Sequence, residues 1–270
     1  MPDGTPARPV SCDTGRVQTI VKRRDDAPDG FFEAEAAGLA WLAAAGGARI
    51  AAVAGVGPGW IELGRIAQTG PTRTAAEAFG SSLARTHTAG AAAFGARPDG
   101  WRGPLYIGRR EMPAADEPSW GAFYARDRVR PFVPIAVDAG NLTAAEAGLV
   151  QRACEVVEAG AFDDREPPAR LHGDLWNGNV LWSADGVVLI DPAAHGGHRE
   201  TDLAMLQLFG CPFLADILEA YDRAAPLRDG WRERVPLHQL HPLAVHAAGH
   251  GRGYGIALAE AARAVLDLAG

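Results

Sequence analysis

Residues 171–182 read LHGDLWNGNVLW, and residues 187–197 continue with VVLIDPAAHGG. In these stretches Asn179 comes five positions after Asp174, and Asp191 ends an apolar run. The segment between the two has the pattern of two short strands joined by a Ser-Ala-Asp-Gly turn, which predicts a β-hairpin. A hairpin of this length folds Asn179 and Asp191 back towards each other, so the stretch predicts one polar site.

The spacing of these polar residues fits phosphoryl transfer, which needs a carboxylate at the acceptor hydroxyl, ligands for Mg²⁺ and a cation on the nucleotide phosphates. In the kinase catalytic loop, His-Arg-Asp precedes an Asn at the same offset. Asp174 is therefore the predicted base. Asn179 and Asp191 are the predicted metal ligands, because Mg²⁺ prefers oxygen donors. The alternative is that the carboxylates only cap a turn and end a strand, but the joint pattern favours catalysis.

A lysine on a strand is the next requirement of such a site. Lys22 lies in the β-rich stretch RVQTIVKRR (16–24) and is the only lysine among 26 Lys and Arg residues. Arginine does not readily replace a compact ammonium on phosphates, so this single lysine indicates a nucleotide contact. A solvated strand end is the alternative.

A glutamate on a helix should hold that lysine. Glu35 and Glu33 both lie in the apolar stretch that follows Lys22, and they are two positions apart, so they point to different faces of a helix. Glu35 is preferred because it shares the core-facing side with Leu39 and Leu42.

The remaining pattern predicts a small strand-rich part over residues 1–66 and a mostly helical part over 67–270. Residues 48–63 read as two strands around a Gly-Pro-Gly turn, and residues 91–119 as an irregular loop. The predicted helices cover residues 31–47, 74–87, 119–133 and 143–160 and several segments after Thr201.

Composition narrows the function classes. Hydrophobic residues make up 47% of the 270, enough for a core, and the net charge of −7 argues against a nucleic-acid binder. No apolar run approaches the length that spans a bilayer, so no membrane partner is expected. Three scattered cysteines, Cys12, Cys154 and Cys211, indicate a reducing cytoplasm. The oligomeric state is left open.

Several stretches resemble one family, the fructosamine (ketosamine) kinases. They are FEAEAAGL (32–39), LHGDLWNGNV (171–180), IDPAAHGGHRETDLAMLQLFG (190–210) and the tail segments AYDRAAPL (220–227) and LHQLHPLAVH (237–246). Aminoglycoside and choline kinases share the polar residues, whereas the Leu-Trp pair and the GHRETDLAM segment narrow the resemblance. The resemblance covers most of residues 16–255. It implies an α+β, protein-kinase-like fold with two lobes: a strand-rich N-lobe, truncated at its start, and a larger, mostly helical C-lobe.

The same resemblance implies the reaction: ATP and Mg²⁺ would serve to phosphorylate a sugar hydroxyl, the 3-hydroxyl in the family, on a ketosamine. The adduct would then release its amine, which is deglycation repair. Trp176 would pack on the sugar, with core packing as the alternative. His195 would line the acceptor pocket or brace the Asp191 loop, and bracing is favoured. Within PDGTPARPV (2–10), only Gly4 could belong to a phosphate loop, and no G-x-G-x-x-G precedes Lys22.

The acceptor should be a small molecule or a flexible glycated amine, because the short segment after Asp191 leaves no room for an activation loop. A phosphotransferase of the aminoglycoside or choline kinase type is a second reading. An inactive kinase-like binding protein, suggested only by the short N-terminus, is a third. Two further signals are weaker. Asp202 would orient the catalytic loop, and His246 with His250 has metal-compatible spacing but reads as ordinary helix histidines.

Overall fold

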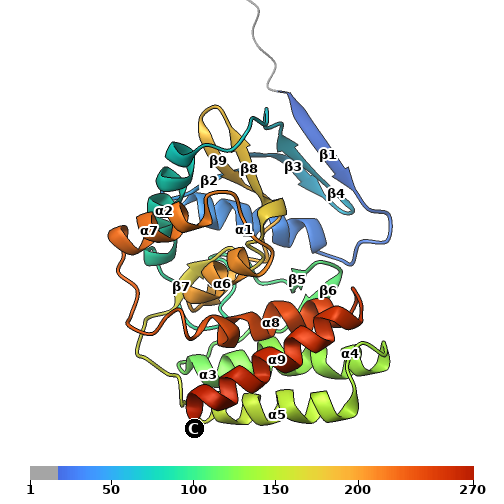
Figure 1. The fold of residues 1–270 in the computed structure, drawn as a ribbon. Coiled ribbons are helices and arrows are strands. Elements are labelled where there is room, and N and C mark those ends of the chain that lie inside the picture. The colour runs from blue at the N-terminus through green and yellow to red at the C-terminus, as the bar shows by residue number, and fades with distance from the viewer. Residues whose placement is uncertain (1–17) are drawn as a thin grey trace, which may run out of the picture.

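A computed structural model of the chain describes residues 18–270. Gly4 and the predicted truncation of the N-lobe lie outside these residues. Figure 1 shows two parts: strands and helix α1 gather at one end, and a stack of helices forms the other. Among residues 18–270, no helix combines the length and the apolar character needed to cross a membrane.

The first sheet carries Lys22. Strands β1 (Thr19–Arg23), β4 (Trp60–Gly64) and β3 (Val53–Gly57) form an antiparallel sheet in the order β1-β4-β3. Strands β3 and β4 are the hairpin that the Gly-Pro-Gly turn predicts. Helix α1 (Phe31–Ala43) packs against the sheet, because Phe32 and Leu39 share a buried apolar cluster with Ile61 of β4. Lys22 is thus held between the sheet and α1.

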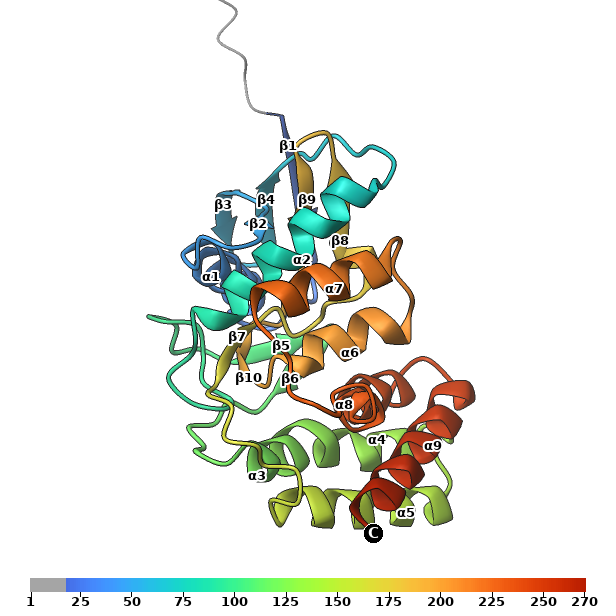
Figure 2. The ribbon, with the colours of Figure 1, turned by 60° about the vertical axis from the view of Figure 1, so that its left-hand side comes forward.

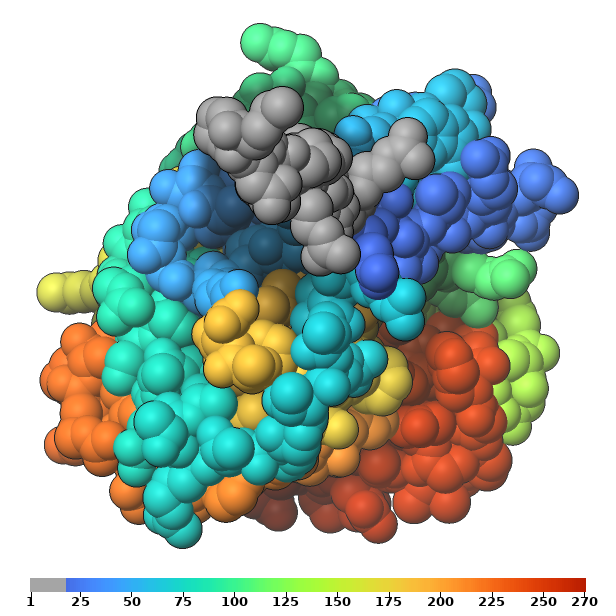
Figure 3. Space-filling view, turned by 90° about the horizontal axis from the view of Figure 1, so that it is seen from above, coloured from blue at the N-terminus to red at the C-terminus, as the bar shows by residue number. Residues whose placement is uncertain are grey.

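A second sheet carries the predicted metal ligands. Strands β8 (Val180–Ser183) and β9 (Gly186–Leu189) form the predicted hairpin, and β2 (Arg49–Ile50) joins β9 in parallel. The segment before the next helix lies beside this hairpin in the view from above (Figure 3). An antiparallel bridge joins Gln68 of that segment to Ser183 of the hairpin. These pairings join residues 49–50 and Gln68 to the 180–189 hairpin, and the predicted division between residues 66 and 67 stays a prediction.

The helices confirm most of the sequence-based expectations. Their bounds are α2 (Arg73–Thr88), α5 (Ala144–Glu158), α6 (Glu200–Leu208), α7 (Leu214–Ala224), α8 (Val235–Ala247) and α9 (Arg252–Ala269). Helices α2 and α7 lie side by side on one flank (Figure 2). Helix α5 begins with a capping box in which the Thr143 and Glu146 side chains satisfy each other's backbone N–H groups.

Two expectations are corrected. Residues 91–119 are not an irregular loop throughout, because β5 (Leu105–Ile107) and β6 (Arg110–Met112) form a hairpin there. The predicted helix over 119–133 is not a single α-helix. It runs through α3 (Trp120–Phe123), the π-helix η1 (Tyr124–Val129) and the 3₁₀ turn η2 (Arg130–Phe132) into α4 (Val133–Asp138). Pro131 and Pro134 lack the N–H groups that a regular helix needs at these positions.

Two short strands complete the frame of the site. Strand β7 (Ala169–Leu171) pairs with β10 (His195–Gly197) in antiparallel register, with Leu171 opposite His195. Neither strand was predicted, since three residues carry too little periodicity. Their pairing places the segment after Asp191 directly beside the segment that leads into His172.

Candidate active site

Lys22 is the first residue that the fold brings to the site. Its Nζ donates to Oε1 of Glu35 at 2.6 Å and also to Oδ1 of Asp191. The structure therefore pairs Lys22 with Glu35 rather than with Glu33, as the helix-face argument predicts. Burial alone would lower the pKa of Lys22, but the two carboxylates outweigh it and raise that pKa, so the ammonium stays charged.

The loop around Asp174 is held by Asp202 at the start of α6. Its Oδ2 accepts the backbone N–H of His172 at 2.8 Å, and its Oδ1 accepts the N–H of Gly173 at 2.9 Å. His87 of α2 contacts the same carboxylate at 3.2 Å. Asp202 thus orients the loop, as expected. The sequence did not predict the contact of His87 with Asp202, because no local pattern links two residues 115 positions apart.

Asp174 and Asn179 are in direct contact. The Nδ2 of Asn179 donates to the backbone O of Asp174 at 2.8 Å and to its Oδ2 at 3.1 Å. Burial raises the pKa of Asp174 to about 6, the hydrogen bond from Asn179 opposes the rise, and the negative charge of Asp191 adds to it. A carboxylate with this pKa is largely ionised at neutral pH, and it is basic enough to take a proton.

The same geometry tests whether Mg²⁺ fits. The amide nitrogen of Asn179 is committed to Asp174, which leaves its Oδ1 as the free acceptor. The Asp191 side chain is 42% exposed and lies just after β9, at a left-handed φ of 54° that turns the chain sharply. An amide oxygen and a carboxylate are the hard donors that Mg²⁺ takes, and open positions remain for water and phosphate.

These side chains line one cleft of about 420 Å³. Its walls include Lys22, Glu35, Asp174, Asn179 and Asp191, together with Trp176 and, from β5, Tyr106. Trp176 is 41% exposed, so core packing does not account for it. Among the described residues that the sequence predicts to bind nucleotide, metal or acceptor or to act as base, all but one line this cleft.

The exception is His195. Its side chain is buried, it does not line the cleft, and its Nδ1 contacts the backbone O of Ala193 at 2.8 Å. The position of His195 therefore does not agree with the predicted contact to the acceptor. The favoured alternative, a brace for the Asp191 loop, agrees with this contact.

An apolar cavity of about 190 Å³ opens on the other side of Lys22 and Asp191. Sequence reasoning did not find it, because its walls come from several strands and loops that are far apart in the sequence. Its apolar lining consists of Ile20, Ala51, Leu63, Ile66, Leu181 and Ile190. A flat aromatic ring suits such a slot.

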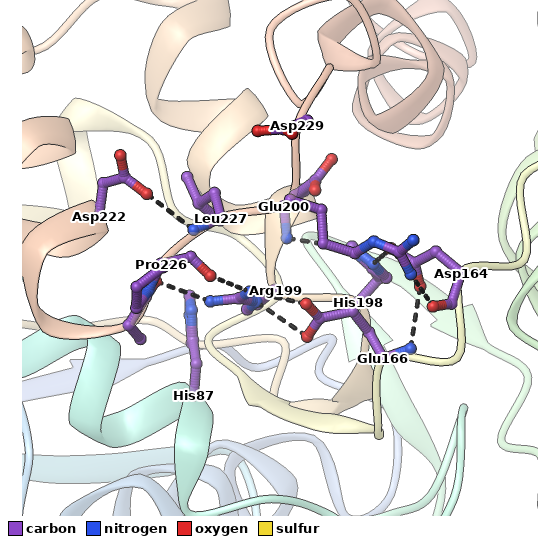
Figure 4. Close-up of polar contacts among 12 residues, drawn as sticks. His87, Asp164, Glu166, His198, Arg199, Glu200, Asp222, Pro226, Leu227 and Asp229 are labelled. Carbon is purple, nitrogen blue, oxygen red and sulfur yellow. Dashed lines mark hydrogen bonds and ion pairs between the residues drawn. The ribbon is translucent and has the colours of Figure 1, made fainter.

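A separate polar cluster surrounds the start of α6 (Figure 4). Arg199 donates to both carboxylate oxygens of Glu166, at 2.7 and 3.0 Å, and His198 contacts Asp164 at 3.2 Å. His198, Glu200 and His238 bring ligand atoms within 4.8 Å of one another. However, the Glu200 carboxylate already accepts two hydrogen bonds from Arg234. The cluster is therefore a structural network that anchors the start of α6, where Asp202 lies.

Comparison with known proteins places the chain among kinases. The family model described as fructosamine kinase matches residues 6–267. A relative in Enterococcus faecium named "probable ketoamine kinase" is 34% identical, over 87% of this chain and 83% of that one. The crystal structure of a "putative fructosamine-3-kinase" from Thermobifida fusca is 48% identical, with a TM-score of 0.86, and the match covers 92% of this chain and 85% of that one.

A more distant structure shows how widely the fold is used. A choline kinase from Streptococcus pneumoniae is 17% identical, with a TM-score of 0.61 over 94% of this chain and 88% of that one. At that identity the likeness concerns the fold alone. The two-lobed, protein-kinase-like α+β fold expected from the sequence is confirmed.

Proposed function

The chain belongs to the fructosamine kinase family, and on that premise we propose that it transfers the γ-phosphoryl group of ATP, with Mg²⁺, to a sugar hydroxyl of a ketosamine. The acceptor position in this proposal is the 3-hydroxyl, which the name of the Thermobifida fusca relative supports. Phosphorylation would lead to release of the amine, which is deglycation repair. The reaction would run in the cytoplasm, the location that the cysteines predict.

One observation carries the proposal: Lys22 lines the same cleft as Asp174, Asn179 and Asp191, although it is far in the sequence from the 174–191 stretch that carries these three. Lys22, braced by Glu35, is positioned for the nucleotide phosphates, and the apolar cavity beside it suits the adenine ring. Asn179 and Asp191 would hold Mg²⁺, which when bound would offset charge on the phosphate oxygens. The assembled set supports an active enzyme over an inactive relic.

Asp174 acts as the general base in this proposal. The acceptor hydroxyl gives its proton to the Asp174 carboxylate while its oxygen bonds to the γ-phosphorus. The bond between that phosphorus and the β–γ bridging oxygen breaks, and ADP leaves with the bond's electron pair. Asn179 keeps the carboxylate oriented through its bond to Oδ2. Because phosphoryl transfer needs little covalent help, the protein contributes mainly position and charge.

The acceptor should lie on the Trp176 side of the cleft. Trp176 is two residues from Asp174, and its exposed indole offers a flat apolar face to a sugar ring. A glycated lysine, free or on a flexible segment, suits a cleft of this size better than a folded surface does.

The test is ADP release from Mg-ATP with four acceptors: ribulose-lysine, fructose-lysine, an aminoglycoside and choline. We expect turnover on a ketosamine, with phosphate on the 3-hydroxyl by NMR of the product. Asp174→Asn should lower kcat by about 10²–10⁴-fold, the range for loss of a positioned base. Asp185→Asn, in the exposed β8–β9 turn, is the matched control and should keep full activity.

Two results would overturn the proposal. Turnover confined to the aminoglycoside or to choline would move the chain to another acceptor class. Full activity in Asp174→Asn would remove the proposed base.

A further inference from the structure

Arg128 is a buried cation that the reaction as proposed does not use. It lies in the π-helix η1 with 1% of its surface exposed. Its Nη1 donates to the backbone O of Pro113 at 2.6 Å, and its guanidinium lies 4.5 Å from the centroid of the Phe123 ring. Within residues 18–270 it forms no ion pair with a carboxylate, and its Nη2 has no hydrogen-bond partner.

Such a group is costly for stability. A buried guanidinium without a carboxylate partner loses hydration that its contacts only partly replace. Packing alone would be better served by an apolar side chain at this position. Residues that break a local rule in this way are found mainly at functional sites, which directs attention to what Arg128 contacts.

The contact that matters is with His195 of β10. The Nε of Arg128 lies 3.3 Å from Nε2 of His195, and arginine can only donate. Nε2 of His195 must therefore accept, which leaves the proton of the neutral ring on Nδ1. That Nδ1–H donates to the backbone O of Ala193 at 2.8 Å. Arg128 thus selects the tautomer that can hold this carbonyl.

The carbonyl of Ala193 lies where the two functional loops meet. Ala193 is two residues after Asp191, whose left-handed φ of 54° is a conformation that non-glycine residues keep only when their surroundings enforce it. On its other side, the carbonyl lies against Gly173 of the catalytic loop. A Cβ added to Gly173 would be 2.2 Å from this oxygen. One carbonyl therefore touches the loops of both Asp174 and Asp191.

We propose that Arg128 is a positioning residue for phosphoryl transfer: through His195 and the carbonyl of Ala193, it sets the place of the Asp191 carboxylate relative to the catalytic loop. The inference rests on the proposed function, because it takes Asp191 as a metal ligand. Arg128 itself touches neither nucleotide nor acceptor, since it does not line the cleft.

The test uses Arg128→Met, His195→Phe and the double variant in the full-length chain. Calorimetry measures the affinity for ADP with and without Mg²⁺. Each single variant should weaken Mg-ADP binding about tenfold, the lower range for loss of a group that orients a metal ligand, and leave metal-free ADP binding unchanged. Since both changes cut the same chain of contacts, the double variant should bind no worse than either single one.

Two controls separate positioning from folding. Arg126→Met removes an exposed arginine of the same π-helix and should bind Mg-ADP like the wild type. Arg128→Lys keeps a buried donor and should recover part of the lost affinity if position is what matters. The imidazole ¹⁵N spectrum of the wild type should show His195 protonated on Nδ1, and this readout needs no variant to fold.

The outcomes are distinct. Mg-ADP affinity in Arg128→Met equal to that in Arg126→Met, additive losses in the double variant, or a proton on Nε2 of His195 would each overturn the inference. Failure of the wild type to phosphorylate any acceptor would instead remove the proposed function. Mg-ADP binding and the His195 spectrum would still test the chain of contacts from Arg128 through His195 to the carbonyl of Ala193.

Discussion

Trp176 exposes 41% of its surface next to the predicted base, and its ring packs edge-on against Phe209, with centroids 6.1 Å apart. A large aromatic side chain normally gains free energy by burial. Its exposure in the cleft therefore fits a surface that a ligand covers, and the covering group would be the acceptor rather than the nucleotide.

At this scale we predict that Trp176→Ala raises the KM for the ketosamine roughly tenfold, the equivalent of about 1.4 kcal/mol of lost stacking. The KM for ATP should stay unchanged, because the nucleotide is proposed to lie beyond Lys22. Steady-state kinetics with each substrate varied measures both values. Trp176→Phe should keep most of the affinity, and Phe213→Ala, another exposed aromatic, serves as the control. An equal rise in both KM values would contradict this assignment.

The element that controls the catalytic loop is helix α6. The first turn of α6 carries this role, because Glu200 and Asp202 are both buried there. Burial alone would raise the pKa of Glu200, but hydrogen bonds from His238 and Arg234 lower it to about 2. Burial lowers the pKa of His238 to about 4, so the ring is neutral at pH 7 and the lasting charge partner is Arg234.

The pH dependence of stability follows from that shift. Because the folded-state pKa of Glu200 is depressed from 4.5, its contribution is complete above pH 4.5 and is lost as the pH falls towards 2. The shift corresponds to about 3 kcal/mol. We expect Glu200→Gln to lower the free energy of unfolding by that order at pH 7 and by less than half as much near pH 3, in urea titrations at both values.

Glu260→Gln, in an exposed position on α9, is the comparison for Glu200→Gln and should behave like the wild type. A Glu200→Gln deficit of the same size at both pH values would show that the loss comes from packing and not from the charge pair.

At the scale of the whole molecule, the site depends on how helices α2 and α7 pack. Gly80 of α2 lies so close to α7 that an added Cβ would be 2.2 Å from the backbone O of Ile217. Helix α2 also carries His87, which contacts Asp202. The helix–helix contact on the flank is therefore coupled to the loop that holds Asp174.

We predict that Gly80→Ala lowers the free energy of unfolding by about 2–3 kcal/mol, the usual cost of overpacking, and also lowers kcat. Gly148→Ala is the matched control, because its Cβ would meet only the Arg152 side chain at 3.8 Å. That change should stabilise α5 by roughly 0.5–1 kcal/mol, through lower chain entropy in the unfolded state. Urea unfolding of both variants measures these free energies. Equal stability of Gly80→Ala and the wild type would contradict the close packing of α2 against α7 at Gly80.

The sequence by itself determined the parts of the site that local pattern encodes. Asn179 and Asp191 flank one hairpin and Asp174 precedes it by a few residues, so their spacing alone predicted that they would meet. The single Lys22 and the face shared by Glu35 and Leu39 were enough to predict the ion pair. Most helices and the two main hairpins follow from hydrophobic period and turn residues, which act over a few positions.

Only the tertiary structure decided what depends on contacts between distant segments. Arg128 and His195 are 67 residues apart, and His87 and Asp202 are 115 apart. The apolar cavity draws its walls from separate strands, and the β5–β6 hairpin is too short to show a period. The physical reason is that periodicity reports which face of an element is buried, whereas the partner that buries it is chosen by packing of the whole chain.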